Sequence, residues 1–471
     1  MSFLPGVHEV DKVSVLYIKN ASNFIITGYN VSSTYAAKIV CRRPAILAFF
    51  NIVNLVIKHL SIVYCGFPLG YEESVAVYLV DITSLKVSNV SVENSTGYGI
   101  IGINILGNSS VSHSRFIFNN YYTFASTNCS YGLGSCEGGH MLLYYGEKLP
   151  ETLVTTTVTT SVLSIDSCIF SDGVDISSSD ETKLSSGIAI LGSQELLNQY
   201  YVDISICNVV STRNVAKRGA NFLFHFNGNF GSINITNSTS SMANYLSPDE
   251  ALHMAGFQFI YSEVDPLIQI PTTNKLLLHI SDSKFYDNNG GGFNFQLDEV
   301  YSNVKYHVLI KNCSFQRNMN LFGSAIRLAD FGTLSRTSGL EVLMEDTSFT
   351  NHMIPDENYN VLPKSGFNVI TVNKMRYLKV INCTFAMNKM TALQAHDSTL
   401  YFGGHVIFSG NNGRLGGALM LQGGSTIYLM PHTYIQIVNN HAKRGGGTYI
   451  EDGNARMLLS TNGSALPIFQ H

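Results

Sequence analysis

The chain contains no tryptophan and little charge. Charged residues make up 13% of its 471 residues, whereas about 25% is ordinary for a soluble protein. The formal net charge of −4 provides no basic field for nucleic acid, so we expect no nucleic-acid partner. The absence of tryptophan removes a favoured platform for sugar rings, although the 25 tyrosines could replace it.

The sequence also lacks a hydrophobic run long enough to cross a membrane. Its most apolar run, Ala45 to Ile57, is interrupted by Asn51 and Asn54, and a span needs roughly 18 to 20 apolar residues. The opening MSFLPGVHEV has neither the basic nor the apolar segment of a signal peptide. We expect no membrane span within this chain, and we interpret it as a fragment of a longer secreted or membrane-anchored protein.

The motifs of common catalytic and metal sites are missing. The eight cysteines form no CxxC pair, the 14 histidines form no HxxxH pair, and HEXXH, GxSxG and P-loop motifs are absent. Gly97 to Gly102 reads GYGIIG and satisfies GxGxxG, but the strand-like INIL follows where a dinucleotide-binding helix would begin. We therefore predict no metal, no cofactor and no enzymatic activity.

Most of the chain consists of one repeated unit. Val308 to Asp330 contains an alternation of apolar and polar residues, a turn near Asn318 and a second apolar strand. Further copies align with Phe315 at Phe170, Val209, Ser240, Phe285, Phe349 and Phe385, with a weaker copy at Phe116 and N-terminal copies starting at Asn23, Asn54 and Ser84. The repetition predicts an all-β, right-handed parallel β-helix solenoid in one domain, residues 1–471, with insertion loops at two corners of the coil.

Two known families have similar repeats. Phe385 with Asn388 and Phe408 with Asn411 form FxxN, and Gly416 begins a GGA triplet, a combination that resembles the repeat of chlamydial polymorphic outer membrane proteins. The whole pattern, including the FLPG-H opening and the NNHAKRGGG segment, resembles still more closely large animal cell-surface proteins with right-handed parallel β-helix repeats. The resemblance covers essentially the full chain. It implies a pectin-lyase-like solenoid, an extracellular or cell-surface location and no assigned activity.

A carbohydrate-active enzyme is the main alternative, because polysaccharide lyases and hydrolases with this fold group several acidic residues on neighbouring coils. In the aligned position before Cys313, only Asp282 and Asp346 are carboxylates. Asn312 lies between them, and stacking of about 4.8 Å per coil separates them by roughly 9.6 Å. This is too thin a group for a calcium cluster. A passenger domain of the autotransporter type is a third interpretation.

The position of Cys313 is occupied by small residues throughout the aligned copies: Cys168, Cys207, Ser238, Ser283, Thr347 and Cys383. Cys313 and Cys383 are expected two coils apart, beyond the ~7 Å limit for a disulfide, so we predict buried free thiols there. The neighbouring Asn237, Asn312 and Asn382 are expected to turn inward and satisfy the corner backbone.

Covalent features are predicted at other positions. Disulfides are expected between Cys41 and Cys65 and between Cys129 and Cys136, which lie outside the stacked column. Among the glycosylation sequons, sugar is expected first at those that flank glycine or insertions: Asn94, Asn108, Asn128 and Asn462. Asn312 and Asn382 are expected to be poor acceptors because they turn inward.

Loops on a rigid solenoid carry recognition because they vary without disturbing the core. The insertions Asn120 to Gly138 and Thr350 to Gly366 therefore form the predicted recognition surface, unless they only cover the coil edge. Its candidate anchors are exposed tyrosines: Tyr121, Tyr122, Tyr131 and Tyr359. We predict a non-enzymatic extracellular or cell-surface scaffold in recognition or adhesion, with a protein or glycan at the cell surface as its partner.

Overall fold

The computed structural model describes most of the chain. The described residues are 1–28, 37–68, 74–119, 139–145, 159–174, 186–192, 200–216, 219–227, 231–244, 255–262, 275–298, 306–320, 323–330, 340–354, 367–451, 454–459 and 468–469. They fall into two compact units, the first made of Met1–Ile233 and Ala243–Ser247 and the second of Asn234–Met242 and Pro248–His471. The prediction of a single domain over residues 1–471 stays a prediction.

Unit 1 is built from parallel strands. They are β1 (Ser2–Phe3), β2 (Gly6–Val10), β3 (Ser14–Lys19), β4 (Asn23–Gly28), β5 (Ala37–Cys41), β6 (Ala45–Val63), β7 (Phe67–Pro68), β8 (Ser74–Glu93), β9 (Tyr98–Ile105), β10 (Asn108–Ser112), β11 (Arg115–Ile117), β12 (Met141–Tyr145), β13 (Thr159–Asp166), β14 (Ile169–Ser171), β15 (Ile188–Gly192), β16 (Tyr200–Cys207), β17 (Val210–Thr212) and β18 (Phe222–Asn227). The short β7 pairs antiparallel with β8. The long β6 and β8 each run along three successive sides of one coil, which the later coils divide among three strands.

Unit 2 repeats the three-strand coil. A first sheet contains β19 (Ile233–Thr236), β22 (Lys275–Ser281), β25 (Tyr306–Lys311), β28 (Leu340–Glu345), β31 (Tyr377–Ile381), β34 (Thr399–Gly403), β38 (Thr426–Leu429) and β42 (Arg456–Leu459). A second contains β20 (Thr239–Ser241), β23 (Lys284–Tyr286), β26 (Ser314–Gln316), β29 (Ser348–Thr350), β32 (Thr384–Ala386), β35 (His405–Ser409), β39 (Tyr434–Val438) and β43 (Ile468–Phe469). A third contains β21 (Phe257–Ser262), β24 (Phe293–Asp298), β27 (Ile326–Asp330), β30 (Asn368–Asn373), β33 (Thr391–His396), β37 (Leu419–Gln422) and β41 (Thr448–Ile450), and β36 (Asn412–Leu415) pairs separately with β40 (His441–Arg444).

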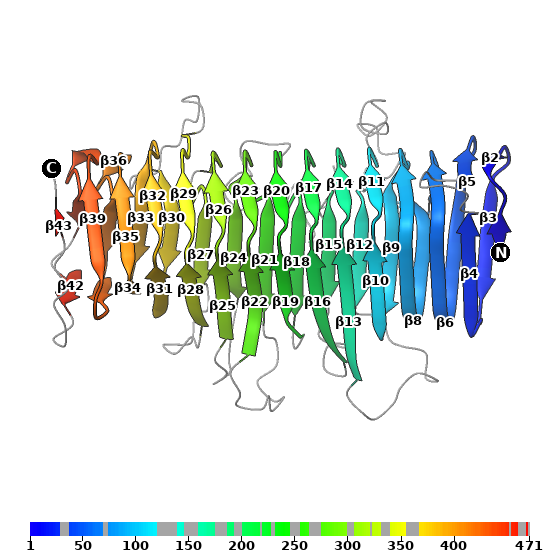
Figure 1. Ribbon diagram of the computed structural model, residues 1–471, viewed down its shortest axis with the longest axis horizontal. Coiled ribbons are helices and arrows are strands. Elements are labelled where there is room, and N and C mark those ends of the chain that lie inside the picture. The colour runs from blue at the N-terminus through cyan, green and yellow to red at the C-terminus, as the bar shows by residue number, and fades with distance from the viewer. Residues whose placement is uncertain are drawn as a thin grey trace. The chain divides into compact units, whose positions relative to one another are not determined.

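Each coil places one strand in each sheet and returns in register with the next coil. Phe285 pairs with Phe315, Phe315 with Phe349, and Phe349 with Phe385, always in parallel. Figure 1 shows the strands of each unit in this parallel stack. The described residues contain no helix. The protein is therefore all-β, with the right-handed parallel β-helix fold that the repeats predicted.

Two corners of the coil require a left-handed backbone. Each second-sheet strand from β20 to β39 is flanked by residues with positive φ, as Asn312 (50°) and Arg317 (48°) flank β26. The same pairs recur as His59 and Tyr64, Asn89 and Asn94, His113 and Phe118, Ser167 and Asp172, Asn208 and Arg213, Asn237 and Met242, Asp282 and Asp287, Asp346 and Asn351, and Asn382 and Met387. Asn and Asp tolerate this conformation best among residues with a side chain, which explains why they recur at the first corner.

The interior of unit 2 contains a stack of phenylalanine rings. Centroid separations are 4.7 Å for Phe285 and Phe315, 5.2 Å for Phe315 and Phe349, 4.8 Å for Phe349 and Phe385, and 4.7 Å for Phe385 and Phe408. These separations match the spacing of stacked strands, about 4.8 Å. Because the five rings are nearly fully buried, the stack joins successive coils into one hydrophobic core.

A ladder of buried asparagines follows the phenylalanine stack. Asn388 donates Nδ2 to Asn411 Oδ1 at 2.7 Å, and Asn411 donates Nδ2 to Asn440 Oδ1 at 2.8 Å. The Nδ2 group of Asn411 also reaches the backbone oxygen of Phe385 at 3.0 Å. The FxxN motif therefore has a structural meaning: its phenylalanine fills the core, and its asparagine satisfies the backbone where the chain turns.

In unit 1 a histidine replaces one asparagine of the corresponding ladder. Gly173 stands at that ladder position and has no side chain to contribute. A Cβ there would lie 2.7 Å from His140 Nε2. Instead, Asn119 donates Nδ2 to His140 Nδ1 at 3.0 Å, and His140 Nε2 donates to Asn214 Oδ1 at 3.1 Å. Burial lowers the pKa of His140 to about 3, which keeps the ring neutral in this chain of hydrogen bonds.

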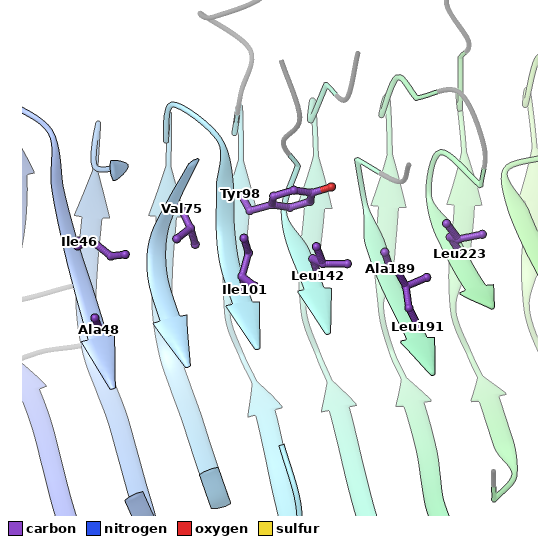
Figure 2. Packing of buried hydrophobic residues seen from close by; sticks show 9 residues of the cluster. All are labelled: Ile46, Ala48, Val75, Tyr98, Ile101, Leu142, Ala189, Leu191 and Leu223. Atoms are coloured by element: carbon purple, nitrogen blue, oxygen red, sulfur yellow. The ribbon is translucent and has the colours of Figure 1, made fainter. Parts of the chain in front are cut away.

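A second apolar layer in unit 1 lies on the outer face of the sheet formed by β9, β12, β15 and β18. Figure 2 shows part of this cluster, with Ile101, Leu142, Ala189 and Leu223 on successive strands. Their neighbours along the strands line the coil interior, because consecutive strand residues point to opposite faces. The cluster is buried, although it lies on the face of the sheet opposite to the coil interior.

The N-terminal register was predicted correctly. Asn23 pairs with Asn54, and Asn54 pairs with Ser84, as the aligned copies required.

No helix among the described residues is long and apolar enough to cross a membrane. The residues GYGIIG lie at the turn into β9 and within that strand.

Candidate recognition surface

The predicted site residues fall partly within the described chain. Cys41 and Cys65 form a disulfide with a Cα–Cα distance of 4.9 Å, which closes the first coils of unit 1. Cys129 and Cys136 lie outside the described residues, as do the sequons Asn128 and Asn462. The four tyrosines proposed as loop anchors also lie outside them: Tyr121, Tyr122, Tyr131 and Tyr359. Binding by the two long insertions stays a prediction.

The two remaining sequons differ in exposure. Asn108 is exposed at the start of β10, whereas Asn94 is half-buried at a left-handed corner. The side-chain oxygen of Asn94 is buried and makes no hydrogen bond among the described residues. Occupancy of both sites stays a prediction, and Asn108 is the more accessible acceptor.

One copy of the repeat was misaligned. Ser211, not Val209, pairs with Phe170, and Asn208 occupies the left-handed corner before it. Val209 therefore takes the inward position that the alignment assigned to Cys207. A shift of two residues leaves every side chain on the same face of a strand, so the apolar pattern could not reveal the error.

The other thiols in this column lie where they were predicted. Cys168, Cys313 and Cys383 are buried and free, and Thr347 lies between Cys313 and Cys383 in the stack. Each sulfur lies near a backbone oxygen, such as that of Lys311 at 3.2 Å from Cys313 Sγ. Burial raises the pKa of Cys313 to about 12, so this thiol stays protonated and unreactive.

The prediction that Asn237, Asn312 and Asn382 turn inward was wrong. All three are exposed, because the left-handed corner directs their side chains away from the core. Asn312 donates Nδ2 to Asp282 Oδ1 at 2.6 Å, and Asn382 donates to Asp346 Oδ1 at 3.2 Å. The physical reason for excluding Asn312 and Asn382 as glycosylation sites is therefore removed.

The two aligned carboxylates belong to this exposed corner ladder. Asn312 lies between Asp282 and Asp346, as the register predicted, and binds one of them. Among the residues that the structure describes, no group of three or more His, Cys, Asp or Glu side chains is arranged to hold a metal ion. The ladder stabilises the corner through hydrogen bonds between neighbouring coils.

The strongest candidate surface is a row of tyrosines on the outer face of the first sheet in unit 2, here called the tyrosine ladder: Tyr377 on β31, Tyr401 on β34 and Tyr428 on β38. Ring centroids are 4.7 Å apart for the first pair and 5.2 Å apart for the second. Tyr401 pairs directly with Tyr428, whereas Tyr377 is its diagonal neighbour across β31 and β34. Tyr428 is 38% exposed, and Tyr377 and Tyr401 are half-buried.

The inward neighbours of these tyrosines hold the ladder rigidly. Leu378, Leu400 and Ile427 are fully buried in the coil, so each tyrosine projects from a strand that is fixed on its other face. Sequence reasoning missed the ladder because the three tyrosines are separated by whole coils. Their alternation with buried residues, in YLKV, TLYF and TIYL, was the available signal.

Positive charge accompanies the tyrosine ladder. Lys379 Nζ lies 4.9 Å from the centroid of the Tyr377 ring, in a cation–π contact. Arg376, just before β31, and Arg456, at the start of β42, are exposed. Burial and the neighbouring tyrosines raise the pKa of Tyr401, and the Lys379 ammonium partly opposes this increase. The ladder thus presents phenol rings beside cations.

The third sheet of unit 2 has a polar outer face, unlike the sheet of β9, β12, β15 and β18 in unit 1. Asn368 donates to Gln394 Oε1, and Gln394 donates Nε2 to Gln422 Oε1 at 2.5 Å. The oxygens Gln258 Oε1, Asn368 Oδ1 and Thr371 Oγ1 are buried without a hydrogen-bond partner among the described residues. The outer face of this sheet in unit 2 is therefore polar where the described residues show it.

Comparisons with known proteins show only distant structural similarity. No known family and no curated protein matches the chain. The chain is similar to PfbA, a surface adhesin of Streptococcus pneumoniae, with 10% identity and a TM-score of 0.31 over 87% of this chain and 84% of that one. It is also similar to the catalytic domain of a GH87 α-1,3-glucanase in complex with nigerose, with 10% identity and a TM-score of 0.29 over 99% of this chain and 64% of that one. At this distance the similarity says nothing about activity, and the resemblance to animal and chlamydial repeat families stays a prediction.

Proposed function

We propose that the protein is a non-enzymatic scaffold for recognition or adhesion, located outside the cell or at its surface, with a protein or glycan as its partner. The tyrosine ladder is the observation that carries this proposal. Partly exposed tyrosines on a rigid support lose little entropy when they bind, and tyrosine and arginine are enriched among the residues that dominate interface energies. The ladder supplies three tyrosines, and Arg376 and Arg456 are exposed near it.

The extracellular location is supported by the chemistry of the chain. The Cys41–Cys65 disulfide is expected in an oxidising compartment. Exposed sequons, including Asn108 and Asn312, are consistent with glycosylation in such a compartment. The low charge of the chain also fits a surface that is covered in part by sugar.

The alternative is a carbohydrate-active enzyme with the same fold, and a third possibility is an autotransporter-type passenger domain. An enzyme would need an acid and a base, or a metal, that converge on one substrate. Asp282 and Asp346 are instead separated by Asn312 and are bound to corner amides. Nothing about the row of Asp282, Asn312 and Asp346 favours a catalytic role over a role in stabilising the corner.

Binding to cells or matrix tests the proposal. The triple substitution Tyr377→Ser, Tyr401→Ser and Tyr428→Ser should weaken binding by at least about 2 kcal/mol, the loss typical of a dominant interface residue. Tyr434→Ser is the matched control, since Tyr434 is half-exposed on the second sheet outside the ladder. Equal binding by wild type and triple variant, with the fold intact, would reject the ladder as the recognition surface.

A further inference from the structure

The two ring contacts in the tyrosine ladder have different geometries. The rings of Tyr401 and Tyr428 are nearly parallel, with an interplanar angle of 16°. The rings of Tyr377 and Tyr401 are tilted by 42°, and their centroids are only 4.7 Å apart. This shorter separation is close to that of two phenol rings joined by a carbon–carbon bond, and such rings are also twisted against each other.

The strand positions suit the same pair. Tyr401 pairs directly with Lys379, so Tyr377, two residues before Lys379, is a diagonal neighbour of Tyr401. Diagonal neighbours lie about 7–8 Å apart, so two aromatic rings fit side by side between these positions. Lys379 contacts the Tyr377 ring through its ammonium group and restricts the orientation of that ring.

Access by an oxidant distinguishes this pair from the buried tyrosines. Tyr98, Tyr145 and Tyr261 are fully buried, so an enzyme-sized oxidant cannot reach them. Tyr377 and Tyr401 lie on the outer face of the first sheet and are only half-buried. Their phenolic hydroxyls can therefore lose hydrogen atoms while the coil stays folded.

We propose that Tyr377 and Tyr401 form a site of oxidative cross-linking, at which a peroxidase with hydrogen peroxide joins them as a dityrosine. Each phenolic O–H loses one proton and one electron, which produces two tyrosyl radicals. The radicals couple through a new Cε–Cε bond, and each ring then loses the hydrogen on that carbon to its own oxygen, which restores both phenols. The two electrons and two protons reduce one hydrogen peroxide to two waters.

The product would be a covalent link between neighbouring coils. It would join β31 to β34 on the outer face, in addition to the backbone ladder between them. Like a disulfide, it would restrict the unfolded chain and oppose the separation of the two coils. This inference does not depend on the recognition function, because it concerns the two rings alone.

The test treats the folded monomer with peroxidase and hydrogen peroxide and maps the products by proteolysis and mass spectrometry. The expected product is a linked pair of peptides containing Tyr377 and Tyr401, two hydrogens lighter than their sum. Tyr377→Phe and Tyr401→Phe should each abolish this linked pair. Tyr428→Phe, the matched control in the same ladder, should leave it at the wild-type yield.

Three outcomes would overturn the proposal. One is the absence of the Tyr377–Tyr401 pair, whatever other tyrosines become linked. Another is coupling of Tyr401 to Tyr428 as the main product within the ladder. The third is a yield that rises with protein concentration and is confined to covalent dimers, since the site joins two residues of one chain.

Discussion

Asn388 and Asn411 lie on adjacent coils of unit 2, and the side-chain amide of Asn388 donates to the side-chain oxygen of Asn411 at 2.7 Å. The same oxygen accepts the backbone N–H of Asn388 at 3.3 Å. Both side chains are buried. One asparagine therefore satisfies two donors of the preceding coil while its own amide binds the backbone oxygen of Phe385.

Asn411→Ala should destabilise unit 2 strongly. It removes the hydrogen bond to the Phe385 oxygen and leaves the backbone N–H of Asn388 without its acceptor, and each unsatisfied buried group costs about 1–3 kcal/mol. We expect a loss of roughly 3 kcal/mol or more in the free energy of unfolding, measured by denaturant titration. Asn412→Ala is the control, because Asn412 is exposed; an equal effect of both substitutions would contradict the role of the buried ladder.

Much of this arrangement was predictable from the repeats, and the failures have physical causes. The period of two and the recurring unit predicted the β-helix, and FxxN supported it through the family resemblance. The same period could not show that Asn312 reverses the backbone with a φ of 50°, so its side chain was assigned to the wrong side. The contact of His140 with Asn214 joins residues that are distant in sequence, and no local pattern indicates it.

Phe349→Ala should also weaken unit 2. Phe349 packs between Phe315 and Phe385 and is fully buried. Removal of a buried phenylalanine side chain costs about 3–5 kcal/mol, and Phe349→Leu should cost less than half of this because it leaves a smaller cavity. The unfolding midpoints of both variants check this order, and a larger loss for Phe349→Leu than for Phe349→Ala would contradict the account in which the lost volume sets the cost.

His352 makes the stability of unit 2 depend on pH. Burial lowers its pKa from 6.5 to about 4, so the folded state favours the neutral ring and the unfolded state binds the proton more readily. The stabilisation is present above the unfolded pKa of 6.5 and is lost progressively as pH falls from there toward about 4.

His352→Asn should reduce this acid sensitivity. His352 occupies the ladder position between Asn318 and Asn388, so asparagine restores the residue found in the neighbouring coils. The free energy of unfolding, measured between pH 7 and pH 4, should fall less with decreasing pH for the variant than for wild type. Parallel pH profiles would mean that His352 is not the titrating group.

The disulfide and the thiols should respond oppositely to chemical probes. Reduction, or Cys41→Ala with Cys65→Ala, should cost about 2–4 kcal/mol of stability by freeing the unfolded chain.

Alkylation of the native protein should spare Cys168, Cys313 and Cys383, which are buried, and should label them after denaturation. Rapid native labelling of Cys313 would contradict its position inside the coil.

The most direct measurement of the proposed function compares binding and turnover on one set of extracellular proteins and polysaccharides. A non-enzymatic recognition scaffold should give saturable binding without cleavage products, and the triple tyrosine-ladder variant should lose this binding. Asp282→Asn and Asp346→Asn should leave binding unchanged. Release of oligosaccharide products by wild type, abolished by either aspartate substitution, would contradict the proposal and favour a carbohydrate-active enzyme.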